Sequence, residues 1–342
     1  MPRNARRSQQ VAELTARVAI KAPDLRRGMA TNALLIAFAV LVLFFSLSSD
    51  VFFTVGNFRT VLLQSALTLV IVTPFALLLM AGYVDLSVGS TVGLSAVVSG
   101  WTMLQGVAWP LAALVGVLTG LVVGLVHSWL VVIRGLSPII VTLGTLSAVR
   151  GLSQIVAPDA LYGFPESFLD FGTAGVLGVP ILVIIAVVVV TVGVVILNWT
   201  ATGKHILATG GNPEAARVSG VNITRIGIWL FVMTGAAAGL GGVMLAARVG
   251  STPAATAGLG LEMAVLTAAL LGGVAFTGGR GTMRGVVLGV LFLALLQNGL
   301  TILNVPPSWS VAAQGTVLVL AAFAEKLAGA QAGKVRSAAT PE

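Results

Sequence analysis

The sequence contains no cysteine and very little charge. Without cysteine, disulfides and thiol chemistry are excluded. Only 9% of the 342 residues are Asp, Glu, Lys or Arg, whereas soluble globular domains carry about 25%. Hydrophobic residues make up 57% of the chain, and its mean hydropathy is +1.04. Such a chain has too few polar side chains to cover its surface in water, so we interpret it as an integral membrane protein.

Catalytic and metal-binding motifs are also lacking. The chain contains neither HExxH nor GxSxG, and its two histidines, His127 and His205, lie far apart in sequence. Residues 202–205 resemble the end of a phosphate-binding loop, but that loop requires Gly at the position of Asn198 and Ser or Thr at that of His205. We therefore expect no metal, no cofactor and no ATP site in this chain, and no enzymatic activity of its own.

Apolar segments long enough to cross a bilayer recur along the chain. The alternating ten-residue pattern of outer-membrane barrels is absent, which leaves helices as the way to satisfy the backbone in lipid. The predicted fold is therefore all-α, with about ten transmembrane helices. The third and eighth segments are short and rich in glycine, so they are candidates for broken or partly re-entrant helices. The ten segments fall near residues 30–48, 58–80, 88–104, 110–133, 138–156, 179–198, 225–247, 261–276, 282–303 and 310–324.

The charges are distributed unevenly between the two sides of this arrangement. The net charge is +8 and the pI about 11.0, but the bases flank apolar segments, which indicates lipid headgroups rather than nucleic acid. If the N-terminus lies inside, sixteen of the nineteen Lys and Arg residues also fall inside. The outside loop 157–178 carries Asp159, Glu166 and Asp170 and no base. The asymmetry predicts an N-in, C-in topology.

Three regions follow from this distribution. Residues 1–29 form a basic cytoplasmic tail, residues 30–327 the transmembrane domain, and residues 328–342 a cytoplasmic C-terminal tail. The apolar run after the first tail is too long for a signal peptide, and no A-x-A site follows it. Two isolated charges, Arg150 and Glu262, lie within apolar segments. Such charges are functional candidates, but we favour the reading in which both extend to the outer interface.

The polar segment 199–224 interrupts the apolar series on the predicted inside. Within it, Asn212 can cap a helix, Pro213 suits the first helical position, and Glu214 complements the positive end of the helix dipole. Gly220 can adopt the left-handed conformation that ends the helix. A helix of two turns is marginal alone in water. We therefore predict a docking element that a soluble partner holds beneath the membrane.

Two glycine-bearing turns are the other polar features. In residues 82–90, Asp85 precedes Ser87, which indicates a helix start; we favour a capping role for Asp85 over direct contact with a substrate. In residues 276–285, Arg280 and Arg284 either anchor the inner membrane interface or contact an acidic patch on a partner. Small residues at four-residue spacing predict close helix contacts at Gly116, Gly120 and Gly124, at Gly281, Gly285 and Gly289, and at Gly235 and Gly239.

Four stretches together resemble the permease subunits of bacterial ATP-binding-cassette importers for simple sugars, the ribose, xylose and galactose type. Their order and spacing match from about residue 55 to residue 327. The family usually has Gly-Gly-Ile before its Asp-Leu-Ser, where this chain has Gly82-Tyr83-Val84. The stretches are Val84-Asp85-Leu86-Ser87-Val88-Gly89-Ser90, Pro138-Ile139-Ile140-Val141-Thr142-Leu143-Gly144, Gly211-Asn212-Pro213-Glu214-Ala215-Ala216-Arg217-Val218-Ser219-Gly220, and Gly278-Gly279-Arg280-Gly281 leading to Gln297-Asn298-Gly299-Leu300.

The resemblance implies a role for several of these residues. The segment 199–224 is expected to couple the permease to an ATPase on a separate chain, which binds the ATP. Arg280 and Arg284, for which both interpretations given above stay open, are candidates for a second contact with that ATPase. The coupling residues are Gly211, Asn212, Pro213, Glu214, Ala215, Ala216, Arg217 and Gly220. Candidates for the translocation path or its gate are Asp85, Leu86, Ser87, Thr142, Gly144, Gln297 and Asn298.

The resemblance also implies partners and a location. The partners are the ATPase subunit, a periplasmic or lipoprotein sugar-binding protein, and a second permease chain, either identical or a paralogue. The expected location is the bacterial cytoplasmic (inner) membrane. Two alternatives remain at this stage. A branched-chain amino-acid permease would share the architecture but usually has a different coupling motif. A self-contained ion-coupled transporter would usually carry a series of midplane carboxylates, which this sequence lacks.

Overall fold

The computed structural model describes residues 34–337, with side chains as far as residue 323. The predicted basic tail, residues 1–29, lies outside the described residues. Within them, each of the ten apolar segments forms a helix close to its predicted position. The described helices are Leu34–Ser48, α2 (Val55–Met80), α3 (Val88–Leu104), α4 (Trp109–His127) with the π-helix η1 (Ser128–Ile133), α5 (Pro138–Val156), α7 (Ile181–Trp199), α10 (Ile223–Val249), α11 (Leu261–Leu271), α12 (Met283–Ile302) and α13 (Pro307–Ser337).

Six of these helices are long and apolar enough to cross a membrane: α2, α4 with η1, α5, α7, α10 and α12. The protein is therefore a multi-pass membrane protein. The apolar parts of the other four are shorter, and they include α3 and α11, the two segments predicted to be short. Helix α11 ends at Leu271 rather than near residue 276 as predicted, because the chain turns at Gly272 and Gly273, the latter with φ +81°.

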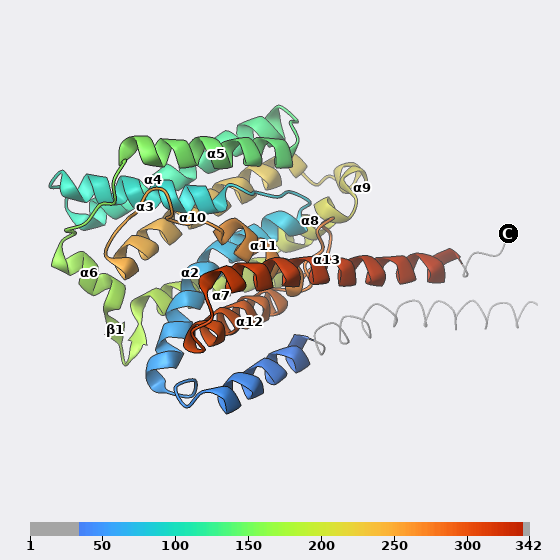
Figure 1. Ribbon diagram of the computed structural model, residues 1–342. Helices are drawn as coiled ribbons and strands as arrows, with labels where there is room; N and C mark the ends of the chain where they lie inside the picture. Colours follow the sequence, from blue (N-terminus) through green and yellow to red (C-terminus); the bar gives the residue numbers. More distant parts are fainter. Residues whose placement is uncertain (1–33, 338–342) are drawn as a thin grey trace, which may run out of the picture.

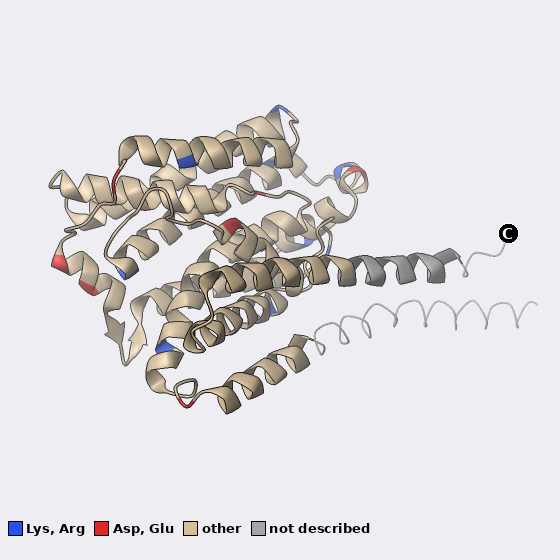
Figure 2. Cartoon of the chain, in the orientation of Figure 1, with Lys and Arg blue, Asp and Glu red and all other residues tan. Residues whose placement is uncertain are grey.

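Short elements fill the two longest polar connections. Before α7 lie α6 (Glu166–Thr173) and a hairpin of β1 (Gly175–Val176) and β2 (Val179–Pro180), paired antiparallel. After α7 come α8 (Ala201–Gly211) and α9 (Pro213–Val218). Figure 1 shows α6 and the hairpin at one end of the bundle and α8 and α9 at the opposite end. Acidic side chains lie on α6, while α9 carries charges of both signs (Figure 2).

The centre of the bundle is formed by α2, α3, α4 and α10, which pack closely. A Cβ at Gly120 of α4 would overlap the carbonyl oxygen of Gly235 and lie 2.7 Å from the Cα of Gly239, both on α10. The predicted glycine contact between these helices is therefore confirmed. A second one joins α11 and α12, where a Cβ on Gly285 or Gly289 would overlap backbone of α11 or of the turn that follows it.

The outer helices have the opposite character. Ile140 and Ile155 of α5 are more than 70% exposed, and Val187 and Val192 of α7 are more than half exposed. Only 17% of the apolar stretch of α5 and 22% of that of α7 is buried within the chain. In a membrane protein such surfaces face lipid or another chain.

Candidate functional site

The short helix α9 forms as its sequence predicts. The Asn212 side-chain oxygen accepts a hydrogen bond from the Ala215 amide at 3.0 Å, and Pro213 occupies the first helical position. Glu214 and Arg217 form an exposed pair at 3.3 Å. The chain leaves the helix at Gly220, whose φ of +84° lies in the left-handed region. All four sequence signals therefore act as local determinants of this helix.

Most of α9 is exposed at its end of the bundle. Ala216 is buried and holds the helix against its neighbours, whereas Val218 is 83% exposed. Ala215 is also exposed, and Trp199, at the end of α7, is 78% exposed. Arg280, in the turn before α12, and Arg284, in the first turn of α12, are exposed too. The segment thus offers a protruding helix with small, charged and apolar side chains to a partner.

Four glycines join the polar segment 199–224 to the rest of the bundle: Gly82, Gly210, Gly278 and Gly279. They are called the glycine crossing below. The Gly279 amide donates a 2.8 Å hydrogen bond to the Met80 carbonyl. A Cβ on Gly210, in the last turn of α8, would overlap that carbonyl and lie 2.5 Å from the Gly279 nitrogen. Gly278 and Gly279 have φ of +82° and +76°. The end of α8 therefore contacts the turns after α2 and before α12 through backbone.

Tyr83 lies next to this crossing, on the side of α9 and α10. Its ring centroid is 5.6 Å from that of Phe231 in α10. Burial raises the pKa of the Tyr83 phenol, and the positive charge of Arg217 partly offsets this effect. Tyr83 and Val84 stand where the family that the sequence resembles usually has Gly-Ile, so this departure lies beside the segment 199–224.

A buried polar cluster of Asp85, Ser87 and His127 follows the crossing. Ser87 donates from its hydroxyl to Asp85 Oδ1 at 2.7 Å and from its amide to the same oxygen at 2.9 Å. His127 Nδ1 lies 3.2 Å from Asp85 Oδ2 without forming a hydrogen bond, and its Nε2 lies 3.5 Å from the Ser87 hydroxyl. The three residues are 0–2% exposed. We call this the closed cluster.

The closed cluster changes the reading of Asp85. The N-cap of α3 is Ser87, and Asp85 caps the Ser87 amide in the turn before the helix rather than the helix itself. Burial opposes the charge of Asp85, but His127 and the hydrogen bonds from Ser87 outweigh it, so the pKa of Asp85 is lowered. The trio has the residue types of a hydrolytic triad. However, the Ser87 hydroxyl is fully buried and bonded to the carboxylate, so no substrate can reach it.

The prediction that Arg150 and Glu262 extend to the outer interface is contradicted for Glu262. Glu262 is 9% exposed, its Oε1 accepts from the Gly260 amide at 3.2 Å, and its Oε2 is buried without a partner. Extension of Glu262 to the interface was therefore wrong. Arg150 is half-buried and donates to the Ala257 carbonyl. Both residues fix the irregular chain between α10 and α11 against α3 and α5.

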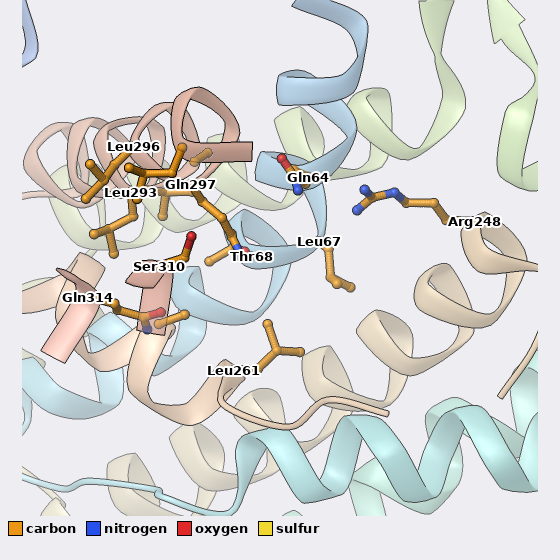
Figure 3. Close-up of a pocket in the computed structure, with 14 residues that line it drawn as sticks. Gln64, Leu67, Thr68, Arg248, Leu261, Leu293, Leu296, Gln297, Ser310 and Gln314 are labelled. Atoms are coloured by element: carbon orange, nitrogen blue, oxygen red, sulfur yellow. The ribbon is translucent and has the colours of Figure 1, made fainter. Parts of the chain in front are cut away.

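A cavity of about 160 Å³ lies between α2, α10, α11, α12 and α13 (Figure 3). Its polar lining comes from Gln64, Thr68, Arg248, Gln297, Ser310 and Gln314, and the rest is Leu, Ala and Val. Oε1 of Gln64 and Nε2 of Gln314 are buried without a hydrogen-bond partner. Among the residues 34–323 whose side chains are described, no group of three His, Asp or Glu is placed to hold a metal ion.

Of the predicted path residues, the structure brings only Gln297 to this cavity. Asn298 points elsewhere and donates to the Asn57 side chain at 2.7 Å. Thr142 bonds within α5, and Gly144 is exposed on the same helix. Leu86 packs against the main core beside the closed cluster. The sequence reasoning missed Gln64, Arg248 and Gln314. The sequence does contain one signal for this polar lining: glutamines at positions 64, 297 and 314 lie inside or at the start of apolar segments.

Comparison with known proteins agrees with this architecture. The family model described as branched-chain amino acid transport system / permease component matches residues 57–322. The D-allose transport system permease protein of Escherichia coli (strain K12) is 35% identical over 291 residues, covering 84% of this chain and 89% of the relative. The galactose/methyl galactoside import permease protein of Haemophilus influenzae is 32% identical over 317 residues, covering 86% and 94%.

A third relative has a similar match. The L-arabinose ABC transporter permease protein of Azospirillum brasilense is 36% identical over 289 residues, covering 84% of this chain and 85% of the relative. No solved structure matches the chain significantly. The chain belongs to the family of permease components of ATP-binding-cassette importers, and its resemblance to the simple-sugar members is confirmed. It is a transport subunit, and membership implies an ATPase subunit and a substrate-binding protein as partners.

Proposed function

We propose that this permease carries a monosaccharide that an external binding protein delivers, and that α9 couples the movement to an ATPase on another chain. The exposed, capped helix α9 is the observation that carries the coupling role. The substrate class rests on the relatives, which are named for D-allose, galactose and L-arabinose. The coupling residues are those predicted, Gly211 to Arg217 and Gly220, with Arg280 and Arg284 as a second contact.

The proposed topology is N-in and C-in, with ten crossings of the bacterial cytoplasmic membrane. The transmembrane domain comprises residues 30–327, with a basic tail before it and a short tail after it. Support comes from the charge asymmetry and from the arrangement of the ends. The acidic helix α6 lies opposite α9, and Arg59 at the start of α2 donates to the Thr173 carbonyl at the end of α6 at 2.7 Å. The α6 end is therefore the outside in this proposal.

A second permease chain, identical or a paralogue, completes the proposed assembly. The apolar faces of α5, α7 and α13 are candidates for this contact, because little of α5 or α7 is buried in one chain. When the ATPase pair closes, α9 moves with it, and the glycine crossing transfers the displacement to the turns after α2 and before α12. The assembly then alternates between outward-open and inward-open states that ATP and the binding protein stabilise differently.

Substitutions on α9 test the coupling role. Glu214→Arg reverses the charge at the positive end of the helix, and Ala215→Trp adds bulk to its small exposed face. Both should reduce co-purification of the ATPase and uncouple its hydrolysis from the binding protein, while the permease remains folded. Glu166→Arg and Ser167→Trp make the same changes in the exposed first turn of α6 and should leave ATPase co-purification intact. Full retention of the ATPase by both α9 variants would refute the assignment.

The topology is tested by single cysteines, since the chain has none. A cysteine at Ser219 should be shielded from an impermeant thiol reagent added to intact cells, whereas one at Ser167 should react. The reverse pattern would exclude the N-in, C-in arrangement.

A branched-chain amino acid is a second candidate substrate, because the matching family is described as a branched-chain amino acid transport permease component. The cavity lining argues against it, because no Asp or Glu is present there to bind an α-ammonium group. Uptake of labelled leucine, compared with D-allose, D-galactose and L-arabinose in vesicles that contain the whole importer, decides between the two classes.

A further inference from the structure

We infer that the cavity between α2, α10, α11, α12 and α13 is a binding site for one sugar molecule within the permease itself, an inference that rests on the proposed function. Three of the five glutamines in residues 34–323 line this cavity. Figure 3 shows Gln64 and Thr68 on one wall, Gln297 and Ser310 on another, and Arg248 at the side.

The lining contains polar atoms without a protein partner. Gln64 Oε1 and Gln314 Nε2 are buried and form no hydrogen bond within the described structure. Buried amide atoms are nearly always paired, so these two are available to bind a solute or ordered water in the cavity. They come from helices 250 residues apart in sequence and converge on one space. Such convergence is typical of a site rather than of accidental packing defects, which are apolar and dry.

The chemistry of the lining selects hydroxyl groups. An amide offers an acceptor and a donor, and each sugar hydroxyl is also both a donor and an acceptor. Gln64 and Gln314 present one free atom of each kind, while Thr68 and Ser310 add hydroxyls. Arg248 adds donors and forms no ion pair among the described residues. Leu67 and Leu261 provide apolar contacts suited to the C–H face of a sugar ring.

The composition and size of the cavity restrict the ligand further. None of the fourteen lining residues is acidic, so an amine cation would have no counter-charge, and none is aromatic. A volume of about 160 Å³ is smaller than the 300–1,000 Å³ typical of drug-sized pockets, which fits a small polar solute better than a peptide.

The site lies in the half of the bundle that receives the substrate in the proposed topology. Arg248 is in the last turn of α10, close to where Gly172 of α6 meets Ala247. Ser310 is in the first turn of α13, and Gln297 is in the last third of α12. These ends lie toward α6 and the hairpin, opposite α9 (Figure 1). A sugar released by the binding protein would reach this site before the glycine crossing.

Sugar protection of a single cysteine tests this site. Because the chain has no cysteine, Ser310→Cys places one thiol in the cavity, and Ser308→Cys places one at an exposed position two residues earlier on α13. The permease–ATPase complex in nanodiscs is treated with a methanethiosulfonate reagent, and label on the permease chain is counted. D-Allose, D-galactose and L-arabinose are the probes, and leucine is the negative control.

The expected result is slower labelling of Ser310→Cys by each sugar that the wild-type importer transports. At a concentration ten times the dissociation constant, the rate should fall about tenfold. Ser308→Cys should label equally with and without sugar. Adding Gln64→Met or Gln314→Met should abolish the protection, whereas Gln154→Met, a glutamine exposed on α5, should not. Protection that survives both cavity variants would overturn the assignment.

Other outcomes separate this inference from the proposed function. If the wild-type importer transports a sugar that never protects Ser310→Cys, the cavity site is refuted and the proposed function stands. If labelling is slow without sugar and accelerates after lipid removal, the cavity holds lipid and the inference is refuted. If no sugar is transported and leucine is, the proposed substrate class itself is wrong.

Discussion

Two polar clusters lie among the apolar helices, and they differ in whether their polar side chains face one another or face a cavity. In the closed cluster, Asp85, Ser87 and His127 contact one another within 2.7–3.5 Å and are almost completely buried. In the cavity, Gln64 and Gln314 each have a buried amide atom that the protein leaves unpaired. In a low-dielectric interior, paired groups stabilise the fold, whereas unpaired ones cost free energy until a ligand or water binds.

The comparison assigns different roles to residues that look equally unusual in sequence. The polar atoms of the closed cluster face one another, although His127 Nδ1 forms no hydrogen bond, and none of the three residues lines the cavity. We therefore assign the closed cluster the role of holding the turn beside the glycine crossing. The cavity has the free atoms and the space that a ligand needs. The predicted path residues Asp85 and Ser87 are therefore better understood as positioning residues for the turn, and Gln297 as part of the substrate site.

Removal of His127 should have the largest effect. His127→Leu leaves the Asp85 carboxylate buried beside an apolar group, and loss of one partner of a buried pair costs about 3–5 kcal/mol. We expect a large fall in the yield of folded permease and in its thermal unfolding temperature in detergent. Asp85→Asn combined with His127→Leu should recover part of the loss. Equal damage from Gln64→Met would show that the two clusters do not differ as described.

Glycine packing beside the closed cluster should matter next. Gly120 is two turns before His127 on α4, and a side chain there would overlap the α10 backbone. Gly120→Leu should lower the free energy of unfolding by about 1–3 kcal/mol or prevent folding. Gly144→Leu on α5 is the control, since nothing lies within 4 Å of a Cβ there. Equal amounts of folded protein for both variants would show that the α4 glycines do not pack against α10.

The pH dependence of stability should report the closed cluster alone. The pKa of Asp85 is lowered in the folded state, so its contribution is fully present above the unfolded value of 3.8 and is lost as the pH falls through the folded value. The unfolding temperature of wild type should therefore decrease more than that of Asp85→Asn below about pH 4. The cavity lining contains no acid that titrates in this range. Parallel curves for the two proteins would exclude the ion pair.

Substitution in the cavity lining should have the smallest effect on stability in the absence of sugar, and with the opposite sign. Gln314→Met keeps the length of the side chain and removes a buried amide without a partner, so stability should rise by about 1 kcal/mol. Thermal unfolding in detergent without sugar measures this change. A clear loss of stability would mean that the Gln314 amide is satisfied in the folded protein, and the contrast between the clusters would disappear.

The sequence predicted the features that depend on neighbouring residues. Asn212, Pro213 and Gly220 determine α9 within nine residues, and the glycines at 116, 120 and 124 mark a close contact because their spacing follows the helix. The helix positions could also be predicted, because each depends only on the hydropathy of about 20 neighbouring residues.

The features that join distant segments could not be predicted in the same way. Asp85 and His127 are 42 residues apart, and no pattern in the sequence pairs them. The cavity is lined by residues of α2, α12 and α13, and the distance of α2 from the other two helices along the chain gives no indication that they meet. Glu262 was misplaced for the same reason, because its burial depends on the chain from 250 to 260 packing against α3.

The glycine crossing determines how motion is transmitted. Side chains at a joint can change rotamer and absorb a displacement, and glycine has no side chain with which to do so. At Gly210 and Gly279 the backbones touch directly, so the joint has little mechanical compliance. We therefore expect a shift of α8 to reach Met80 and the turn before α12 with little loss. In the proposed transport cycle, such a stiff joint would let a small movement of α9 change the access of a distant site.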